Sequence, residues 1–211
     1  MKKTLMFLAA GLLVALPSAY GTVLNPGDSG VTPDVFSNIS NYTLMNSTSG
    51  TGTFKTLAFS YNAYVAADQN NTFCAGCLDF AYVVTNTGTD NIDLISTGSF
   101  AGWKTDVGYY NGQPGLPPDS VSRNSGTGAA INFNYIPTEL TTGNSSAYLV
   151  IETNTHWYTD GTITAQDGVS ANGLVPVFAP AIPEPMSMGL LGGGLALLGL
   201  LGMRRRKAVK L

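Results

Sequence analysis

Two cysteines and one histidine have the clearest capacity for chemistry in this chain. Cys74 and Cys77 are its only cysteines, and His156 is its only histidine. The spacing Cys-x-x-Cys is compatible with half of a zinc site, a redox pair or a structural disulfide. Zinc normally takes four ligands and a redox pair normally opens a helix in a βαβ unit, and the sequence shows neither setting. We therefore predict a short-loop disulfide and a histidine at the surface or at a strand edge.

Carboxylates and hydroxyl groups are the next candidates for catalysis or metal binding. Serines are plentiful, but no Gly-x-Ser-x-Gly motif marks a nucleophile. Paired acids hydrolyse glycosidic bonds, yet no local motif singles out Glu139 or Glu152. For calcium, residues 90–93 and the pair Asp160 and Asp167 supply oxygen ligands near expected turns, without an EF-hand pattern. Turn formation explains the same residues, so we predict no metal or other cofactor, with calcium as the alternative.

Aromatic side chains offer a third kind of chemistry, the stacking of sugar rings. The candidates for such a face are Trp103, Tyr109, Tyr110, Trp157 and Tyr158. Neighbouring residues of a strand point to opposite faces, so Tyr109 and Tyr110 cannot both belong to it. Packing of these rings in a core is the alternative interpretation.

The chain between residues 22 and 182 has few charges, and most of them are acidic. Only Lys55, Lys104 and Arg123 are basic there, against twelve Asp and Glu, which gives a net charge of −9. Nucleic acid is a poor partner for such a surface, because phosphate binding requires basic residues. The many Thr, Asn, Ser, Gly and aromatic residues suit antiparallel sheets with one solvent-exposed face.

An alternation of period two predicts the elements that position these groups. Every odd residue of 57–65 is apolar or aromatic, and the even residues of 78–84 repeat the pattern with Asp79 opposite. Further strands are expected over 92–100, 105–110, 129–136, 147–153 and 161–166, with turns at 86–90, 111–112, 117–119, 142–144 and 160–161. This pattern predicts an all-β fold, one antiparallel β-sandwich or jelly-roll-like domain over residues 22–175.

The N-terminus has the three parts of a secretory signal peptide. Lys2 and Lys3 precede a mostly apolar run over 4–16, and Ala19 and Gly21 form a small-x-small cleavage site. We therefore predict a signal peptide over 1–21 and a mature chain that begins at residue 22.

The C-terminus carries a second apolar run, residues 186–203, without a charge. At about 1.5 Å per residue this run spans roughly 27 Å, close to a hydrocarbon core of about 30 Å. Positive charge beside a span stays on the cytoplasmic side. The basic residues that follow the run are Arg204, Arg205, Arg206 and Lys207. We predict a transmembrane helix over 186–203, a basic cytoplasmic tail over 204–211, and a stiff Pro-rich linker over 176–185.

The end of the chain resembles a known sorting signal. Pro183, Glu184 and Pro185, then a Gly/Leu-rich span and an arginine cluster, are similar to the PEP-CTERM signal of Gram-negative bacteria over residues 182–211. The resemblance implies recognition by an exosortase, an integral-membrane transpeptidase-like enzyme, and co-occurrence with exopolysaccharide production. Residues 74–86 also resemble a stretch of other exported PEP-CTERM proteins, which implies no known activity.

Together these features predict a non-enzymatic exported protein, held transiently in the inner membrane and then sent to the cell surface or extracellular matrix. A structural or adhesive role in the envelope or biofilm is expected. A domain that binds extracellular polysaccharide is the alternative, and an exposed, coplanar row of aromatic side chains would distinguish it. An exported hydrolase is the third hypothesis, which two convergent carboxylates in a cleft would distinguish.

Overall fold

The computed structural model of the chain describes residues 23–36, 42–168, 170–171 and 175–181. Four predicted features lie outside these residues: the signal peptide, the Pro-Glu-Pro motif, the transmembrane helix and the basic tail. Within the described residues, no helix has the length and hydropathy needed to cross a membrane.

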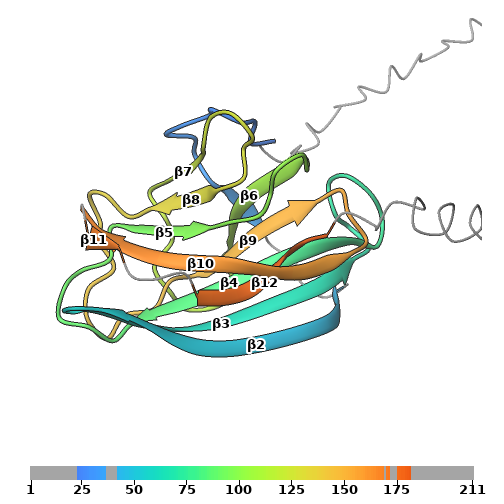
Figure 1. Cartoon of the computed structure of the whole chain (residues 1–211). Coiled ribbons are helices and arrows are strands. Elements are labelled where there is room, and N and C mark those ends of the chain that lie inside the picture. The colour runs from blue at the N-terminus through green and yellow to red at the C-terminus, as the bar shows by residue number, and fades with distance from the viewer. Residues whose placement is uncertain (1–22, 37–41, 169, 172–174, 182–211) are drawn as a thin grey trace, which may run out of the picture.

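Strands joined by loops make up the described part of the chain (Figure 1). The first sheet has the strand order β1-β6-β9-β4-β3-β2, and the second sheet has the order β11-β10-β5-β8-β7, with β12 also paired to β10. Strand β1 runs parallel to β6, and the other pairs are antiparallel. The bounds are β1 Asp34–Phe36, β2 Tyr42–Phe54, β3 Leu57–Asp68, β4 Cys77–Asn86, β5 Leu94–Thr97, β6 Thr105–Tyr110, β7 Ser120–Arg123, β8 Ile131–Asn134, β9 Tyr148–Thr153, β10 Tyr158–Asp167, β11 Ser170–Ala171 and β12 Val175–Pro180.

The two sheets pack against each other around a shared hydrophobic core, as the predicted all-β sandwich requires. In Figure 1, β10 and β12 lie across β3 and β4. The odd-numbered side chains of 57–65 and the even-numbered side chains of 78–84 are all buried, which confirms both predicted faces. The second sheet adds Ile95, Phe133 and Ile163 to the same core.

Core packing fixes the strand register, and the register decides which residues meet on the outer face of the first sheet. Asp79 of β4 lies opposite Glu152 of β9, and Glu152 lies opposite Asp106 of β6. Directly opposite residues have Cβ atoms about 4.5–5.5 Å apart. Three carboxylates therefore stand side by side on this face.

The Pro-rich linker predicted over 176–185 is wrong for residues 176–180. These residues belong to β12, which pairs with β10 over Tyr158–Ile163 and buries Val177, Phe178 and Ala179. Among the described strands β12 pairs with β10 alone, and proline is tolerated on such an edge because its missing N–H is not needed. Burial of the apolar side chains between the prolines thus outweighs the unfavourable effect of proline on strand pairing.

The turn predicted at Asp160 and Gly161 is also wrong, because both residues lie inside β10. Gly161 pairs with Val177 of β12. A Cβ atom on Gly161 would approach the Cβ of Ala179 to 2.5 Å. Glycine at this position permits the close approach of β12 and does not reverse the chain.

Arg123, at the end of β7, joins the second sheet to the loops beside it. The side chain is buried, and each of its five guanidinium N–H groups has an acceptor. The acceptors are Leu24 O (2.9 Å), Phe100 O (2.8 Å), Trp103 O (2.9 Å), Gly128 O (2.8 Å) and Thr105 Oγ1 (3.1 Å). The segment before β1, the 100–103 loop and β6 are thereby held against β7.

We expect Arg123→Met to lower the free energy of unfolding by on the order of 3 kcal/mol, because it leaves buried carbonyl groups without donors. Arg123→Lys should recover part of this loss, since an ammonium group supplies three donors. Urea denaturation measures both, with the exposed Lys104→Met as control. Equal stability of Arg123→Met and the wild type would contradict the role assigned to this side chain.

Candidate functional site

Four acidic side chains gather on the outer face of the first sheet and form what we call the carboxylate cluster. Its members are Asp68 of β3, Asp79 of β4, Asp106 of β6 and Glu152 of β9. Asp68, Asp79 and Glu152 each place one carboxylate oxygen within 4.8 Å of the others. All four are nearly inaccessible to solvent, with exposures of 3%, 3%, 0% and 4% in the order given. Asp34 of β1 lies beside Asp106 and Glu152.

The loop between β3 and β4, residues 69–76, covers the cluster with hydrogen-bond donors, and we call it the capping loop. Thr72 donates from its backbone N to Glu152 Oε2 at 2.7 Å, and from its hydroxyl to Asp106 Oδ2 at 3.0 Å. Each of the other two carboxylates also receives one donor from this loop. These donors are Asn71 Nδ2, 2.7 Å from Asp79 Oδ1, and Asn70 N, 2.8 Å from Asp68 Oδ1.

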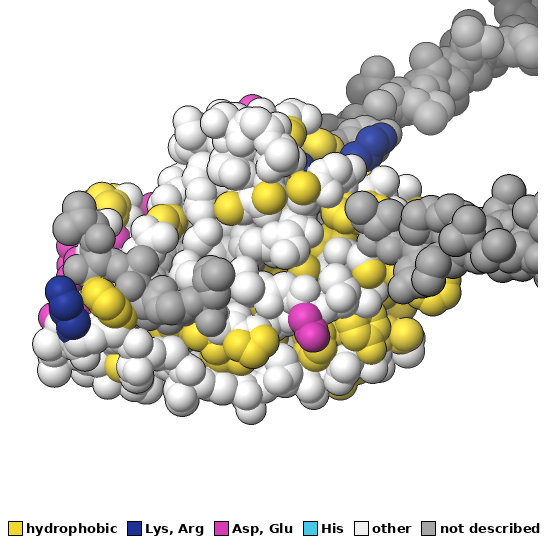
Figure 2. Space-filling model, in the orientation of Figure 1, with side chains coloured by type: hydrophobic (Ala, Val, Ile, Leu, Met, Phe, Trp, Pro, Cys, Tyr) yellow, Lys and Arg dark blue, Asp and Glu magenta, His cyan; other side chains and the backbone are white. Residues whose placement is uncertain are grey.

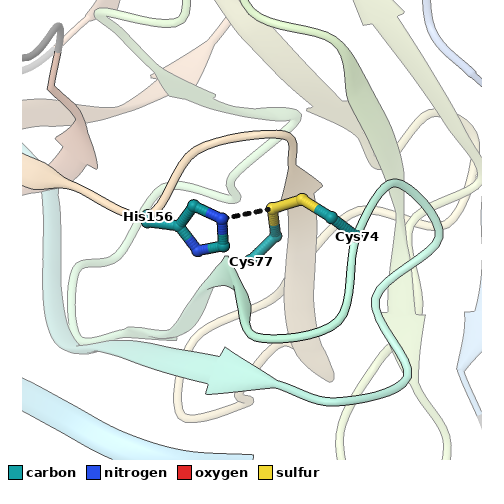
Figure 3. A group of neighbouring side chains, drawn as sticks. All are labelled: Cys74, Cys77 and His156. Atoms are coloured by element: carbon teal, nitrogen blue, oxygen red, sulfur yellow. Dashed lines mark hydrogen bonds between the residues drawn. A yellow bond between two sulfur atoms is a disulfide. The ribbon is translucent and has the colours of Figure 1, made fainter.

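A disulfide closes this loop, in line with the predicted pair. Cys74 and Cys77 are bonded with a Cα–Cα distance of 5.3 Å, and Cys77 begins β4. His156 is exposed, as predicted, and its ring faces the disulfide (Figure 3), with Nε2 3.8 Å from Cys77 Sγ and Nδ1 3.1 Å from Gly76 O. Sulfur atoms bonded to each other are not thiolate ligands, so in this state the three residues do not form a zinc site. The disulfide instead holds the loop over the cluster.

Burial and proximity raise the pKa values of the clustered acids. Burial, and then the charge of Glu152, raise the pKa of Asp79 well above its ordinary range. Burial and the neighbouring Asp34 and Glu152 raise the pKa of Asp106 to about 8. Burial also raises the pKa of Glu152, against the lowering effect of its hydrogen bonds from Thr72. Each shift reflects the cost of a buried charge beside like charges.

Two oxygens of the cluster lack a hydrogen bond. In the described part of the chain, Asp79 Oδ2 and Asp106 Oδ1 are buried and have no hydrogen-bond partner. The Tyr42 hydroxyl lies beside Asp79 and the Asp34 carboxyl lies beside Asp106, close enough for each to affect the pKa of its neighbour, but neither forms a hydrogen bond of good geometry with these two oxygens. A buried carboxylate oxygen without a partner is costly, so these atoms mark an incompletely satisfied site.

A pocket of about 200 Å³ adjoins the cluster on the same face. Its floor consists of small side chains of the central strands, and four tyrosines stand around it. The lining residues are Tyr42, Leu44, Tyr64, Ala66, Asp79, Ala81, Tyr110, Tyr148 and Val150. The rings of Tyr64 and Tyr148 stack with centroids 5.9 Å apart and an angle of 22° between their planes. Asp79 belongs to both the pocket and the cluster.

The structure does not bring the predicted aromatic set together. Of its five members only Tyr110 lines the pocket. Tyr109 points to the opposite face, Tyr158 packs edge-on against Phe178 at 5.6 Å, and Trp157 is 61% exposed elsewhere. The other tyrosines of the pocket were missed, although alternation in 57–65 already placed Tyr64 on the outer face.

The residues predicted as calcium ligands form a separate acidic surface. Gly168, next to Asp167, donates from its backbone N to Asp93 Oδ2 at 3.0 Å, and burial and then the charges of Asp93 and Asp90 raise the pKa of Asp167. Asp160 instead pairs with Phe178 further along β10. In the view of Figure 2, acidic groups lie at the left end of the molecule, where Figure 1 places β11. Among the described residues, carboxylates of this surface do not converge as those of the cluster do.

Comparison with protein-family models, with curated proteins and with solved structures gave no match.

The raised pKa values predict how stability depends on pH. A folded-state pKa above the unfolded value means that the folded protein retains protons that the unfolded chain loses. The resulting stabilisation is complete below about pH 4 and is lost as the pH rises through the pKa of Asp106, about 8. With EDTA present to remove any bound metal ion, we expect the free energy of unfolding to fall as the pH rises from 5 to 8. The slope is about 1.4 kcal/mol per pH unit for each retained proton.

Urea denaturation at pH 5, 6, 7 and 8 measures this slope. Asp106→Asn should make it shallower, whereas Asp160→Asn, at an exposed position of β10, should leave it unchanged. A wild-type stability that is constant or rises over this range would show that the clustered acids are ionised in the folded protein.

Proposed function

We propose that this chain is an exported, non-catalytic β-sandwich protein of the cell envelope or extracellular matrix, which adheres to polysaccharide through its tyrosine-walled pocket. The observation that carries the proposal is the pocket itself. Four tyrosines surround a floor of small side chains beside a carboxylate. Apolar and aromatic groups make up nearly all of the pocket surface, and aromatic faces pack against the apolar faces of sugar rings.

The dimensions of the pocket suit one ring of a longer chain. Pockets for drug-sized molecules are roughly 300–1,000 Å³, and this one is about 200 Å³. Ala66, Ala81 and Val150 keep the floor low, and the Tyr64–Tyr148 stack forms one wall. Leu44, which is 61% exposed, extends the apolar surface beyond the pocket. A polymer could therefore continue along the sheet on either side of the bound ring.

The same geometry favours binding over hydrolysis. Acidic residues do converge here, as the hydrolase hypothesis requires. A glycosidase, however, needs two carboxyl groups that both reach the substrate, and within the cluster only Asp79 lines the pocket. Glu152 and Asp106 instead accept hydrogen bonds from Thr72 beneath the capping loop.

Export and sorting are the second part of the proposal and rest on the sequence of the two ends. A cleavable signal peptide at 1–21 carries the chain out. The Pro183-Glu184-Pro185 motif is then presented to an exosortase-type enzyme at the inner membrane. A disulfide between Cys74 and Cys77 and a surface with few basic residues support a location outside the cytoplasm. Adhesion to exopolysaccharide would then retain the processed protein in the matrix.

A glycan array followed by calorimetry with the retained oligosaccharide tests the pocket on the full chain. We expect Tyr64→Ala and Tyr148→Ala each to weaken binding about tenfold, the loss of one stacking contact of about 1.4 kcal/mol. Trp157→Ala is the matched control, because it removes an exposed aromatic side chain outside the pocket. Absence of any retained glycan, or an equal loss in Trp157→Ala, would rule the pocket out as the binding surface.

Neutral substitutions at Arg204, Arg205, Arg206 and Lys207 test the sorting step. Without the charge that fixes the orientation of the span, we expect the unprocessed protein to accumulate or to leave the membrane. Cell fractionation and the intact mass of the native product measure this effect. Lys210→Gln serves as the control, because Lys210 lies outside the basic group 204–207. Unchanged location and unchanged mature mass would argue against the sorting role.

A further inference from the structure

We propose that the carboxylate cluster is a binding site for a hard divalent cation, with Ca²⁺ as the best fit, held by Asp68, Asp79 and Glu152 with Asp106 beside them. The site differs from the acidic surface around Asp93 and Asp167. It does not depend on polysaccharide binding, because the pocket and the cluster share Asp79 alone.

The spacing of the oxygens matches one ion. Ca²⁺ takes oxygen ligands at about 2.3–2.6 Å, so two ligands of the same ion lie at most about 5 Å apart. The oxygens offered by Asp68, Asp79 and Glu152 all lie within 4.8 Å of one another. They come from three adjacent strands, β3, β4 and β9, whose register is fixed by the core on the other face. The ligands are thus held in place before the ion arrives.

The unsatisfied oxygens point independently to a missing partner. Asp106 is completely buried and Asp79 is 3% exposed, yet Asp106 Oδ1 and Asp79 Oδ2 have no hydrogen-bond partner in the described part of the chain. The capping loop supplies one donor to each carboxylate and leaves these two atoms aside. Asp79 contributes to the cation group itself, and Asp106 stands directly opposite Glu152.

The cluster must also be neutralised, either by protons or by a counter-charge. Like charges directly opposite on neighbouring strands destabilise a sheet, and here they are buried as well. Arg123 is the buried basic side chain of the described residues, and its five donors are all used by other acceptors. A divalent cation would neutralise two carboxylates at once. Asp79 also lines the pocket, so the cluster adjoins a cavity on the same face of the sheet.

The test uses the full chain, purified in mild detergent and stripped with EDTA. Ca²⁺ at a hundredfold excess over its Kd should raise the melting temperature by about 5–10 °C, and EGTA should reverse the shift. Tb³⁺ is a second probe, because Tyr42, next to Asp79, should sensitise its luminescence. Added Ca²⁺ should displace the bound Tb³⁺ and quench that signal.

Two variants locate the site. Asp79→Asn should weaken Ca²⁺ binding at least tenfold, yet melt higher than the wild type in EDTA, because a buried amide does not have to be neutralised by a proton or an ion. Glu152→Gln should behave in the same way, so the result does not depend on one variant. Asp167→Asn, on the other acidic surface, should keep the full response to Ca²⁺.

Three outcomes would overturn the proposal. The first is a wild-type protein whose melting temperature does not respond to Ca²⁺ at millimolar concentration, which would mean that protons alone neutralise the cluster. The second is a response that survives in both Asp79→Asn and Glu152→Gln. The third is a loss of the Ca²⁺ response in Asp167→Asn, which would place the binding site at the separate acidic surface around Asp93 and Asp167.

Discussion

The repulsion between carboxylates that share one face of the first sheet is the constraint around which the candidate site is organised. Asp79, Glu152 and Asp106 stand opposite one another on three neighbouring strands, and the register leaves them no freedom to separate. A shift of one residue in any of these strands would turn its apolar side chains out of the core. The hydrophobic core therefore holds the acids together, and the energy of apolar burial opposes their repulsion.

The loop that caps the acids is built to oppose the same repulsion. Thr72 and Asn71 direct donors at Glu152, Asp106 and Asp79. The disulfide between Cys74 and Cys77 restricts the loop that carries them. Hydrogen bonds to a carboxylate favour its charged form, while burial disfavours it. Since the pKa values of all three acids are raised, the loop donors only partly compensate for burial.

Strands that bury one face were predictable from the sequence, and strands without such a face were not. The alternation in β3 and β4 was strong enough to identify the core face of each. Strand β2 is longer than either, but its Ser, Thr and Gly residues are mostly exposed, so it shows no apolar period. Strand β12 was mistaken for a linker because its prolines suggested an extended connection, although its apolar residues complete the core.

The candidate site was harder to predict, because its members come from distant parts of the chain. Alternation placed Asp79 on the outer face, where an acid is expected to meet solvent. Its neighbours Asp68, Asp106 and Glu152 are contributed by separate strands, so only the strand order and register show that they converge. Their burial depends on the capping loop, for which no periodic pattern exists. The disulfide was predictable because its two partners are close in sequence.

Asp79 connects the two halves of the candidate site and gives them a common chemistry. As an ion ligand it is an anionic acceptor, whereas as a protonated acid it becomes a donor. The tyrosine rings offer apolar faces in either state. The way in which the cluster is neutralised therefore decides whether the Asp79 carboxyl group, which adjoins the pocket, accepts or donates hydrogen bonds. In the proposed binding of sugar rings, the preference of the pocket among rings of similar shape would depend on that state as well as on the aromatic walls.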